Sequence, residues 1–498
     1  MSDIDGFHGR AGIVGLCRGL YVASVFILNI GLARTMGPET FGSFQQVFIF
    51  NALFIILTLG VPETMYFFLP RLDEEERHRF LGQTLVVLTV AGAVGVIVFW
   101  LGAPFFAAIQ HNPEIESRLR MFAVYGAFLV ASSFSDPVFI TFKRIRYLFV
   151  LNAVHALFLL GLTVWYYISK GSPDFLFAGM AVFGFFKYLL AIILLYRMKP
   201  IIGEIWFFKG KSMLGLQLSF ALPMVLSTTI DIISRWLDKY VVSLLFGTEA
   251  LGVFFVGAIE IPFIAVFVSS VFSVVSPALN SLHHKNDIKG FVKLTSNTLK
   301  FTSKIIWPIF IYFFVFADHI IPLVFREDFT GAIAPFRIYL LLMPLRIATY
   351  GVIVVALSRP RVVLQCAFLA LAANVVLNIV LALQIGFIGP AIATVVSSYM
   401  HVFMLVYIII DILKVRIRDI IPVSFLISVA LLSGFSVLVA YGLTFLLYND
   451  LEVVGLSIVV FTGIYFFLAS KAGLIRLSDY LELAGGGFFG KTNDGGTD

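Results

Sequence analysis

Long apolar runs constrain the fold of this chain more than any other feature. An apolar helix of about 20 residues crosses the hydrocarbon core of a bilayer, which is about 30 Å thick. Fourteen segments qualify, over residues 12–34, 41–69, 81–108, 120–142, 147–168, 174–196, 213–246, 250–277, 298–325, 331–357, 361–384, 387–410, 420–447 and 451–471. They lack the alternating pattern of a membrane β-strand. The sequence therefore predicts an all-α polytopic membrane protein with about fourteen transmembrane helices.

The composition excludes several other classes of protein. Of the 498 residues, 60% are hydrophobic and 13% are charged, and the charged share is about half that of a soluble domain. A soluble enzyme, a nucleic-acid-binding domain and a disordered scaffold are excluded on this ground, and no nucleic acid is expected as a partner. The two cysteines, Cys17 and Cys366, permit no disulfide framework and have no metal-binding spacing.

Lys and Arg residues are distributed unevenly between the two sides of the predicted helices. With a cytoplasmic N-terminus, 22 of the 35 lie in cytoplasmic loops or at the termini. Five lie on the opposite side, namely Arg34, Arg118, Arg120, Lys170 and Arg326. Because cytoplasmic loops carry the excess of basic residues, both ends are predicted to be cytoplasmic. The loops are short, so no extracytoplasmic domain is expected.

The sequence contains an internal repeat at an offset of about 210 residues. The segment 37–44 (GPETFGSF) aligns with 247–254 (GTEALGVF), and 144–146 (RIR) aligns with 359–361 (RPR). Each pair falls at corresponding helix junctions, and six helices separate equivalent points. Because six is even, the two halves enter the membrane in the same sense, which predicts a parallel repeat.

This repeat predicts the organisation of the chain. We expect an N-terminal six-helix bundle over residues 1–200 and a C-terminal six-helix bundle over 201–412. Two additional helices follow over 413–471, and a disordered cytoplasmic tail occupies 472–498. Two bundles with a cleft between them form the architecture of an alternating-access transporter.

Three segments carry a resemblance to a known family. They are 33–42 (ARTMGPETFG), the run from Asp238-Lys239-Tyr240 to Gly252-Val253-Phe254, and the run from Asn378 through 385–394 (IGFIGPAIAT). They resemble bacterial polysaccharide flippases of the multidrug/oligosaccharidyl-lipid/polysaccharide exporter superfamily, over about residues 10–470. The resemblance implies translocation of an undecaprenyl-diphosphate-linked oligosaccharide repeat unit across the bacterial inner membrane.

Charged residues within the predicted helices are the candidates for a binding site, because a charge at mid-bilayer costs about 2.5–3.5 kcal/mol on insertion scales. The helix over 213–246 carries Asp231, Arg235, Asp238 and Lys239 on one face. Two interpretations are open. The acids neutralise the bases within the helix, or Arg235 and Lys239 line the cleft and bind an anionic head group.

Three further cations lack an evident local partner. Arg18 lies in the first helix and Lys187 in the sixth, and Arg346 would share a helical face with Tyr339 and Tyr350 at spacings of seven and four. A guanidinium group binds phosphate in a bidentate manner, and aromatic rings pack on sugar rings. The alternatives for each cation are snorkelling to an interface and pairing with an acid on a neighbouring helix.

The acidic residues within the helices are the candidates for a coupling ion, Na⁺ or H⁺. Glu260, which precedes Pro262, lies deeper than Glu63 and Asp136, which fall near the cytoplasmic ends of their helices. Glu260, Asp231 and Asp238 are therefore the candidates. No resident metal or cofactor is expected. Residues 485–492 (GGGFFGKT) match the phosphate-loop pattern, but no strand precedes them, so ATP binding is not expected.

The leading hypothesis is therefore a lipid-linked oligosaccharide flippase rather than an enzyme. The diphosphate head group of the cargo enters a cationic cleft, and the prenyl chain of the cargo stays among the membrane lipids. A polysaccharide polymerase is a candidate partner. Two alternatives stay open. One is a multidrug antiporter for organic cations in the same superfamily, and the other is a membrane-embedded glycosyltransferase or polymerase.

Overall fold

Helices make up most of the described structure of the protein. The computed structural model describes residues 2–199, 205, 212–447 and 449–474, and of residues 2–18, 223, 224, 227, 262 and 446 it describes the backbone alone. Every regular element in these ranges is a helix. The motif at 485–492 and nearly all of the tail predicted over 472–498 lie outside the described residues.

Eight helices lie within residues 2–199 of the described structure. They are α1 (Ser2–Ile49), α2 (Asn51–Leu57), α3 (Val61–Phe68), α4 (Glu74–Ile109), α5 (Ile115–Ser132), α6 (Ser135–Thr141), α7 (Ile145–Ser169) and α8 (Pro173–Tyr196). The acidic N-cap Asp73 accepts a hydrogen bond from the Glu76 amide and so fixes the start of α4.

In the second half, short 3-10 segments interrupt the α-helices more often. It holds α10 (Leu214–Gly257), α11 (Pro262–His284), α12 (Ile288–Val315), α13 (Ala317–Phe325), η1 (Glu327–Ala332), α14 (Ile333–Leu340), η2 (Met343–Ile347), α15 (Tyr350–Ala356), α16 (Pro360–Ile385), η3 (Gly386–Ile388) and α17 (Gly389–Leu413). The chain ends in α18 (Ile417–Ile420), α19 (Val423–Gly442), η4 (Leu443–Leu446) and α20 (Asp450–Lys471).

Eleven helical segments of the described chain are long and apolar enough to cross a membrane, and the bent pair Glu327–Leu340 with Met343–Ala356 makes a twelfth. Two of the eleven, Gly19–Phe68 and Pro360–Leu413, have 50 and 54 residues, about twice what one crossing requires. They turn at Gly37 and Gly386, where φ is positive. Dividing each at its turn gives fourteen crossings, as the sequence predicts. The chain is a multi-pass membrane protein.

The outward-facing side chains agree with a lipid environment. Leu101, Ile168 and Leu383, from three different helices, are 74–75% exposed. Isolated apolar side chains of this kind are common on soluble proteins, but here they cover the outer faces of long helices. Spanning segments that are helical also suit a bilayer, because lipid offers no partner to an unpaired backbone group.

The backbone repeats at the offset that the sequence alignment gives. Gly37 and Gly247, which are 210 residues apart, interrupt α1 and α10 with φ of 74° and 84°. Lys143 and Ser358, which are 215 residues apart, both have a positive φ of about 60° two residues before α7 and α16 begin. The two halves therefore share their turns as well as their sequence pattern.

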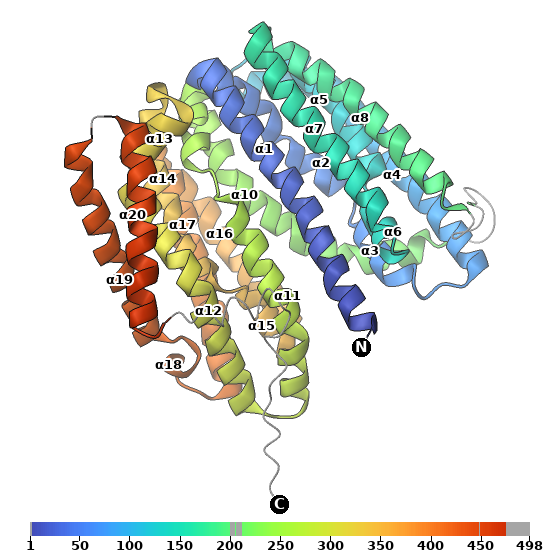
Figure 1. The fold of residues 1–498 in the computed structure, drawn as a ribbon. Coiled ribbons are helices and arrows are strands. Elements are labelled where there is room, and N and C mark those ends of the chain that lie inside the picture. Colours follow the sequence, from blue (N-terminus) through green and yellow to red (C-terminus); the bar gives the residue numbers. More distant parts are fainter. Residues whose placement is uncertain (1, 200–204, 206–211, 448, 475–498) are drawn as a thin grey trace, which may run out of the picture.

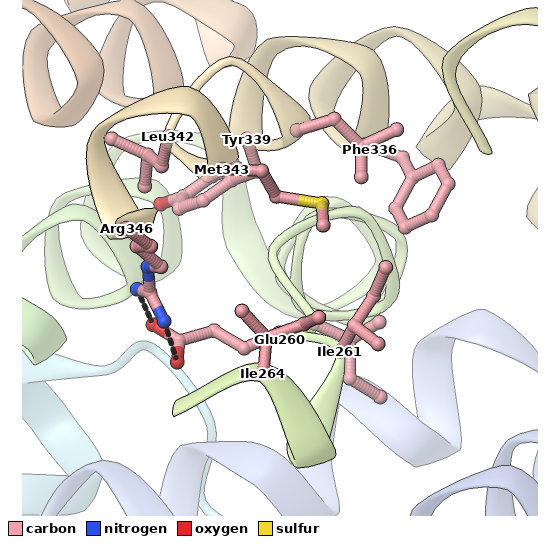
Figure 2. Close-up of a pocket in the computed structure, with 10 residues that line it drawn as sticks. Glu260, Ile261, Ile264, Phe336, Tyr339, Leu342, Met343 and Arg346 are labelled. Atoms are coloured by element: carbon pink, nitrogen blue, oxygen red, sulfur yellow. Dashed lines mark hydrogen bonds and ion pairs between the residues drawn. The ribbon is translucent and has the colours of Figure 1, made fainter. Parts of the chain in front are cut away.

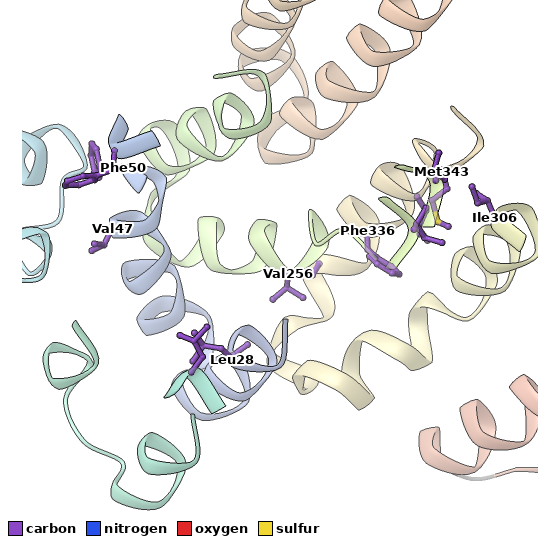
Figure 3. Close-up of a cluster of buried hydrophobic side chains, with 14 of the residues drawn as sticks. Leu28, Val47, Phe50, Val256, Ile306, Phe336 and Met343 are labelled. Carbon is purple, nitrogen blue, oxygen red and sulfur yellow. The ribbon is translucent and has the colours of Figure 1, made fainter. Parts of the chain in front are cut away.

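Helices α1–α8 lie on one side of the molecule and α10–α17 on the other, with α19 and α20 at the outer edge beside α12 and α13 (Figure 1). The first helices of the two repeats, α1 and α10, pack against each other. One hydrophobic cluster runs from Leu28 and Phe50 of the first half to Val256, Phe336 and Met343 of the second (Figure 3). Helix α1 begins and α20 ends at the same end of the molecule (Figure 1).

Two glycines allow a close approach between the halves. A Cβ atom at Gly42 would overlap the carbonyl oxygen of Thr248, and a Cβ atom at Gly252 would overlap the carbonyl oxygen of Pro38. These positions are equivalent in the repeat, so the contact is reciprocal. Small residues at such a crossing allow two backbones to approach closely within a membrane.

We expect Gly42→Ala to destabilise the protein by about 1–3 kcal/mol, because the added methyl group overpacks this crossing. The matched control is Gly455→Ala in α20, where a Cβ atom meets nothing within 4 Å. The control should gain helix propensity and lose no stability. Thermal unfolding in detergent measures both variants, and equal midpoints would contradict the close contact.

Candidate functional site

The charged face of α10 carries an accessible ion pair. The guanidinium group of Arg235 contacts the carboxylate of Asp231 one turn earlier in the helix, and their side chains are 62% and 63% exposed. The sequence also allows a pair between Arg235 and Asp238, but Asp238 has other partners. Both charges of the first pair are therefore open to a ligand.

Asp238 is the buried acid of this face. Its side chain is 1% exposed, and its Oδ2 accepts hydrogen bonds from the hydroxyl of Tyr339 in α14 and from Thr394 Oγ1 in α17, the latter at 3.2 Å. Lys239 Nζ lies 3.3 Å from Asp238 Oδ1 and donates to the carbonyl of Arg235 at 3.1 Å. This pair therefore fastens α10 to α14 and α17.

A second accessible ion pair joins the turn after α10 to η2. Arg346 Nη1 and Nη2 donate to Glu260 Oε2 and Oε1 at 2.8 and 2.5 Å, so the pair is bidentate (Figure 2). The side chains of Arg346 and Glu260 are 31% and 47% exposed. They line a small pocket of about 30 Å³ together with Tyr339 and apolar side chains of α11 and α14.

These groups form one electrostatic cluster. The charges of Arg346, Lys239 and Arg235 all act on Glu260, and the charge of Asp231 acts on Arg346. The cluster contains three bases and three acids, and each base has a carboxylate partner. The side chains of Arg235 and Arg346 are 62% and 31% exposed, whereas the Lys239 side chain is 13% exposed.

The structure places the other predicted residues elsewhere. Lys187 Nζ lies 3.1 Å from His155 Nδ1, and His155 Nε2 lies 3.0 Å from the hydroxyl of Tyr125, so Lys187 belongs to a polar network inside the first half. Tyr350 is buried in the hydrophobic core. Arg18 belongs to α1, where the structure describes its backbone and not its side chain.

The continuous helix predicted over 331–357 is wrong. The chain forms α14, η2 and α15 there, with a bend of 43° between its two parts. The spacings that related Arg346 to Tyr339 and Tyr350 therefore lose their helical meaning. Tyr339 still reaches the cluster, through Asp238. Pro344, in the first turn of η2, is the sequence signal for this break.

A larger hollow lies between the halves, and sequence reasoning did not find its lining. It has a volume of about 180 Å³ and is lined by α1, α2, α5, α7 and α8 on one side and by Trp236 and Phe255 of α10 on the other. Its polar side chains are the neutral groups of Tyr21, Asn29, Gln45, Asn51 and Tyr125. Charged residues alone do not point to this hollow. The sequence signal that does is the set of three amides in the first two spans, Asn29, Gln45 and Asn51.

The described residues offer no site for a resident metal. No group of three or more His, Cys, Asp or Glu side chains in that part of the chain is arranged to hold one. The acids of the cluster each face a base instead. The cluster therefore consists of ion pairs, and a charged ligand can compete with either partner of an accessible pair.

Comparison with sequence families gives two matches. The model of a family described as "Polysaccharide biosynthesis protein" matches residues 31–334. A protein of Haloferax volcanii named "Probable low-salt glycan biosynthesis flippase Agl15" is 24% identical over 166 residues. That match covers 32% of this chain and 35% of the relative, so the chain spans about a third of the length of the relative it matches.

Solved structures share the fold over most of the chain. A structure of the lipid II flippase MurJ, in an inward closed conformation, matches with a TM-score of 0.72 and 17% identity, covering 94% of this chain and 99% of that one. An inward-facing multidrug resistance MATE family transporter of the MOP superfamily matches with a TM-score of 0.61 and 15% identity, covering 80% and 96%. At such identities the likeness concerns the fold.

Removing one partner of the Arg346–Glu260 pair should cost more stability than removing both. We expect Arg346→Met to destabilise the protein by about 1–3 kcal/mol, because Glu260 loses both of its hydrogen bonds. The double variant Arg346→Met/Glu260→Met should recover most of that loss. Thermal unfolding measures each variant.

The control for this cycle is Lys414→Met. Lys414 pairs with Asp411 at a site where both side chains are largely exposed, so its loss should change stability by less than about 1 kcal/mol. If the double variant is as unstable as Arg346→Met alone, the two charges are not coupled as their geometry indicates.

Proposed function

Because the chain belongs to the family of polysaccharide biosynthesis proteins, we propose that it is a flippase for a lipid-linked glycan. The cargo is an oligosaccharide repeat unit on undecaprenyl diphosphate, and the step is its translocation across the bacterial inner membrane. The fold shared with a lipid II flippase and with multidrug transporters supports this proposal. No bond is made or broken in this step, so no residue has a catalytic role and no cofactor is needed.

The observation that carries the proposal is the accessibility of two guanidinium groups within membrane-spanning helices. The Arg235 side chain, on α10, is 62% exposed and the Arg346 side chain, on η2, is 31% exposed. Helix α10 also forms one wall of the hollow between the halves. Guanidinium groups bind phosphate oxygens in a bidentate manner. A diphosphate carries more charge than the single carboxylate facing each Arg, and it competes for both.

This competition supplies a role for the acids. When the diphosphate takes Arg235 and Arg346, the carboxylates of Asp231 and Glu260 lose their partners. A freed carboxylate in a membrane favours uptake of a cation, either H⁺ or Na⁺. Exchange of partners within one cluster would therefore couple cargo binding to ion binding.

Movement of the two halves completes the cycle. Residues 1–200 and 201–412 act as two bundles that rock about the glycine crossing of α1 and α10, while 413–471 form an additional pair of helices. Both termini lie in the cytoplasm. The prenyl chain remains among the membrane lipids during the movement, and a polysaccharide polymerase uses the delivered repeat unit.

A multidrug transporter is the second candidate, and one observation favours it. The cluster holds as many acids as bases, and Asp231 and Glu260 are exposed enough to bind an organic cation. The fold of MATE transporters is also similar. Efflux of cationic dyes from cells that express the protein would distinguish this candidate from the flippase.

The charge-removal series Arg18→Ala, Arg235→Ala and Arg346→Ala tests the flippase. Each variant should abolish export of the surface polysaccharide while the amount of protein in the membrane stays the same. Lys170→Ala is the control, because Lys170 lies in the turn after α7, outside the cluster, and it should leave export intact. Normal export by all three variants would refute the role of the cationic site.

A further inference from the structure

The hollow between the halves has a lining without formal charge. Its polar groups are two tyrosine hydroxyls and three amides, from Asn29, Gln45 and Asn51, and its remaining lining is apolar or aromatic. Ligand pockets of this kind orient a neutral ligand through a few polar groups. The hollow differs in this respect from the ionic cluster.

The repeat relates this lining to the charged face of α10. An offset of 210 residues places four lining residues of α1 on the four charged positions of α10 in order: Tyr21 on Asp231, Val25 on Arg235, Leu28 on Asp238, and Asn29 on Lys239. One helix face therefore lines a site in both halves. It is ionic in the second half and neutral in the first.

The amides of the hollow retain hydrogen-bonding capacity. Gln45 Nε2 donates to Asn29 Oδ1 at 2.6 Å, and Asn29 Nδ2 donates to the carbonyl of Val25 at 2.8 Å. Among the described residues, the side-chain carbonyl of Gln45 and the whole side-chain amide of Asn51 have no partner. An amide offers both donors and an acceptor, which is what a ligand rich in hydroxyl groups requires.

Aromatic rings complete this environment. Trp236 closes the hollow from α10, and Tyr21 and Tyr125 line it from the first half. Flat apolar faces beside unpaired amides match a sugar ring, which presents C–H faces and hydroxyl edges. Lys239 Nζ also lies 6.0 Å from the centroid of the Trp236 ring, so the neutral site adjoins the ionic one.

We propose that this hollow is the binding site for the uncharged sugar rings of the cargo. The proposal rests on the flippase function and adds a division of labour to it. The second half holds the diphosphate at Arg235 and Arg346, and the first half selects the glycan through Gln45, Asn51 and the aromatic rings. Because the two sites adjoin across the gap, a single cargo molecule can occupy both.

Binding to the full chain in nanodiscs tests this division. The two probes are undecaprenyl diphosphate without sugar and the polyprenyl-diphosphate-linked glycans extracted from cells that make the protein. The wild type should bind the glycan-linked probe more tightly than the bare one. Gln45→Leu and Asn51→Leu should each weaken binding of the glycan-linked probe about tenfold and leave binding of the bare probe unchanged, whereas Arg346→Gln should weaken both.

The control is Asn374→Leu, a buried amide whose hydrogen bonds stay within α16 and which lines neither site. It should bind both probes as the wild type does. The Asn51 side chain makes no hydrogen bond to the described residues, so Asn51→Leu serves as the test if Gln45→Leu does not fold.

Three outcomes would overturn the inference, and they are distinguishable. In the first, the wild type binds both probes equally. In the second, the amide variants fold and either leave binding of the glycan-linked probe unchanged or weaken binding of both probes alike. Each of these two outcomes refutes the sugar site and leaves the flippase standing. If the wild type binds neither probe, the flippase itself is refuted, and the sugar site is refuted with it.

Discussion

A charge within a membrane-spanning helix needs a partner, and the cluster around α10 depends on this constraint. Three bases and three acids come together from α10, the turn that follows it and η2. The buried pair of Asp238 and Lys239 ties α10 to α14 and α17. The two accessible pairs fix their helices less firmly, which leaves their charges available for exchange with an anionic ligand.

The two halves use one backbone plan for different chemistry. They share the turns at Gly37 and Gly247 and the reciprocal crossing of Gly42 and Gly252. The same face of the first helix is neutral in one half and ionic in the other. A duplicated scaffold therefore provides two adjoining environments, and a cargo that joins a charged group to uncharged sugars has use for both.

Hydropathy and repeat spacing predict most of the fold, because apolar length alone determines where a helix can cross a bilayer. The sequence also shows that one helical face carries Asp231, Arg235, Asp238 and Lys239, because their spacing follows the period of a helix. The break before Arg346 was missed because hydropathy continues through it. The pairing of Arg346 with Glu260 depends on how distant segments pack, which spacing does not encode.

The neutral hollow was missed for a different reason. Amides and tyrosines carry no signal of their own in an apolar helix, and they become a site only when α1, α2, α5 and α10 surround one space. Lys187 depends on packing in the same way. Its charge predicts a place in the cleft, and the structure adds a contact with His155 in the first half that spacing does not encode.

The central claim is that a diphosphate exchanges places with the carboxylates at Arg235 and Arg346. A cryo-electron microscopy structure of the protein with undecaprenyl diphosphate bound tests it most directly. The account predicts phosphate density within hydrogen-bonding distance of both guanidinium groups, with Asp231 and Glu260 turned away. Intact Arg235–Asp231 and Arg346–Glu260 pairs, with the phosphates bound elsewhere, would contradict it.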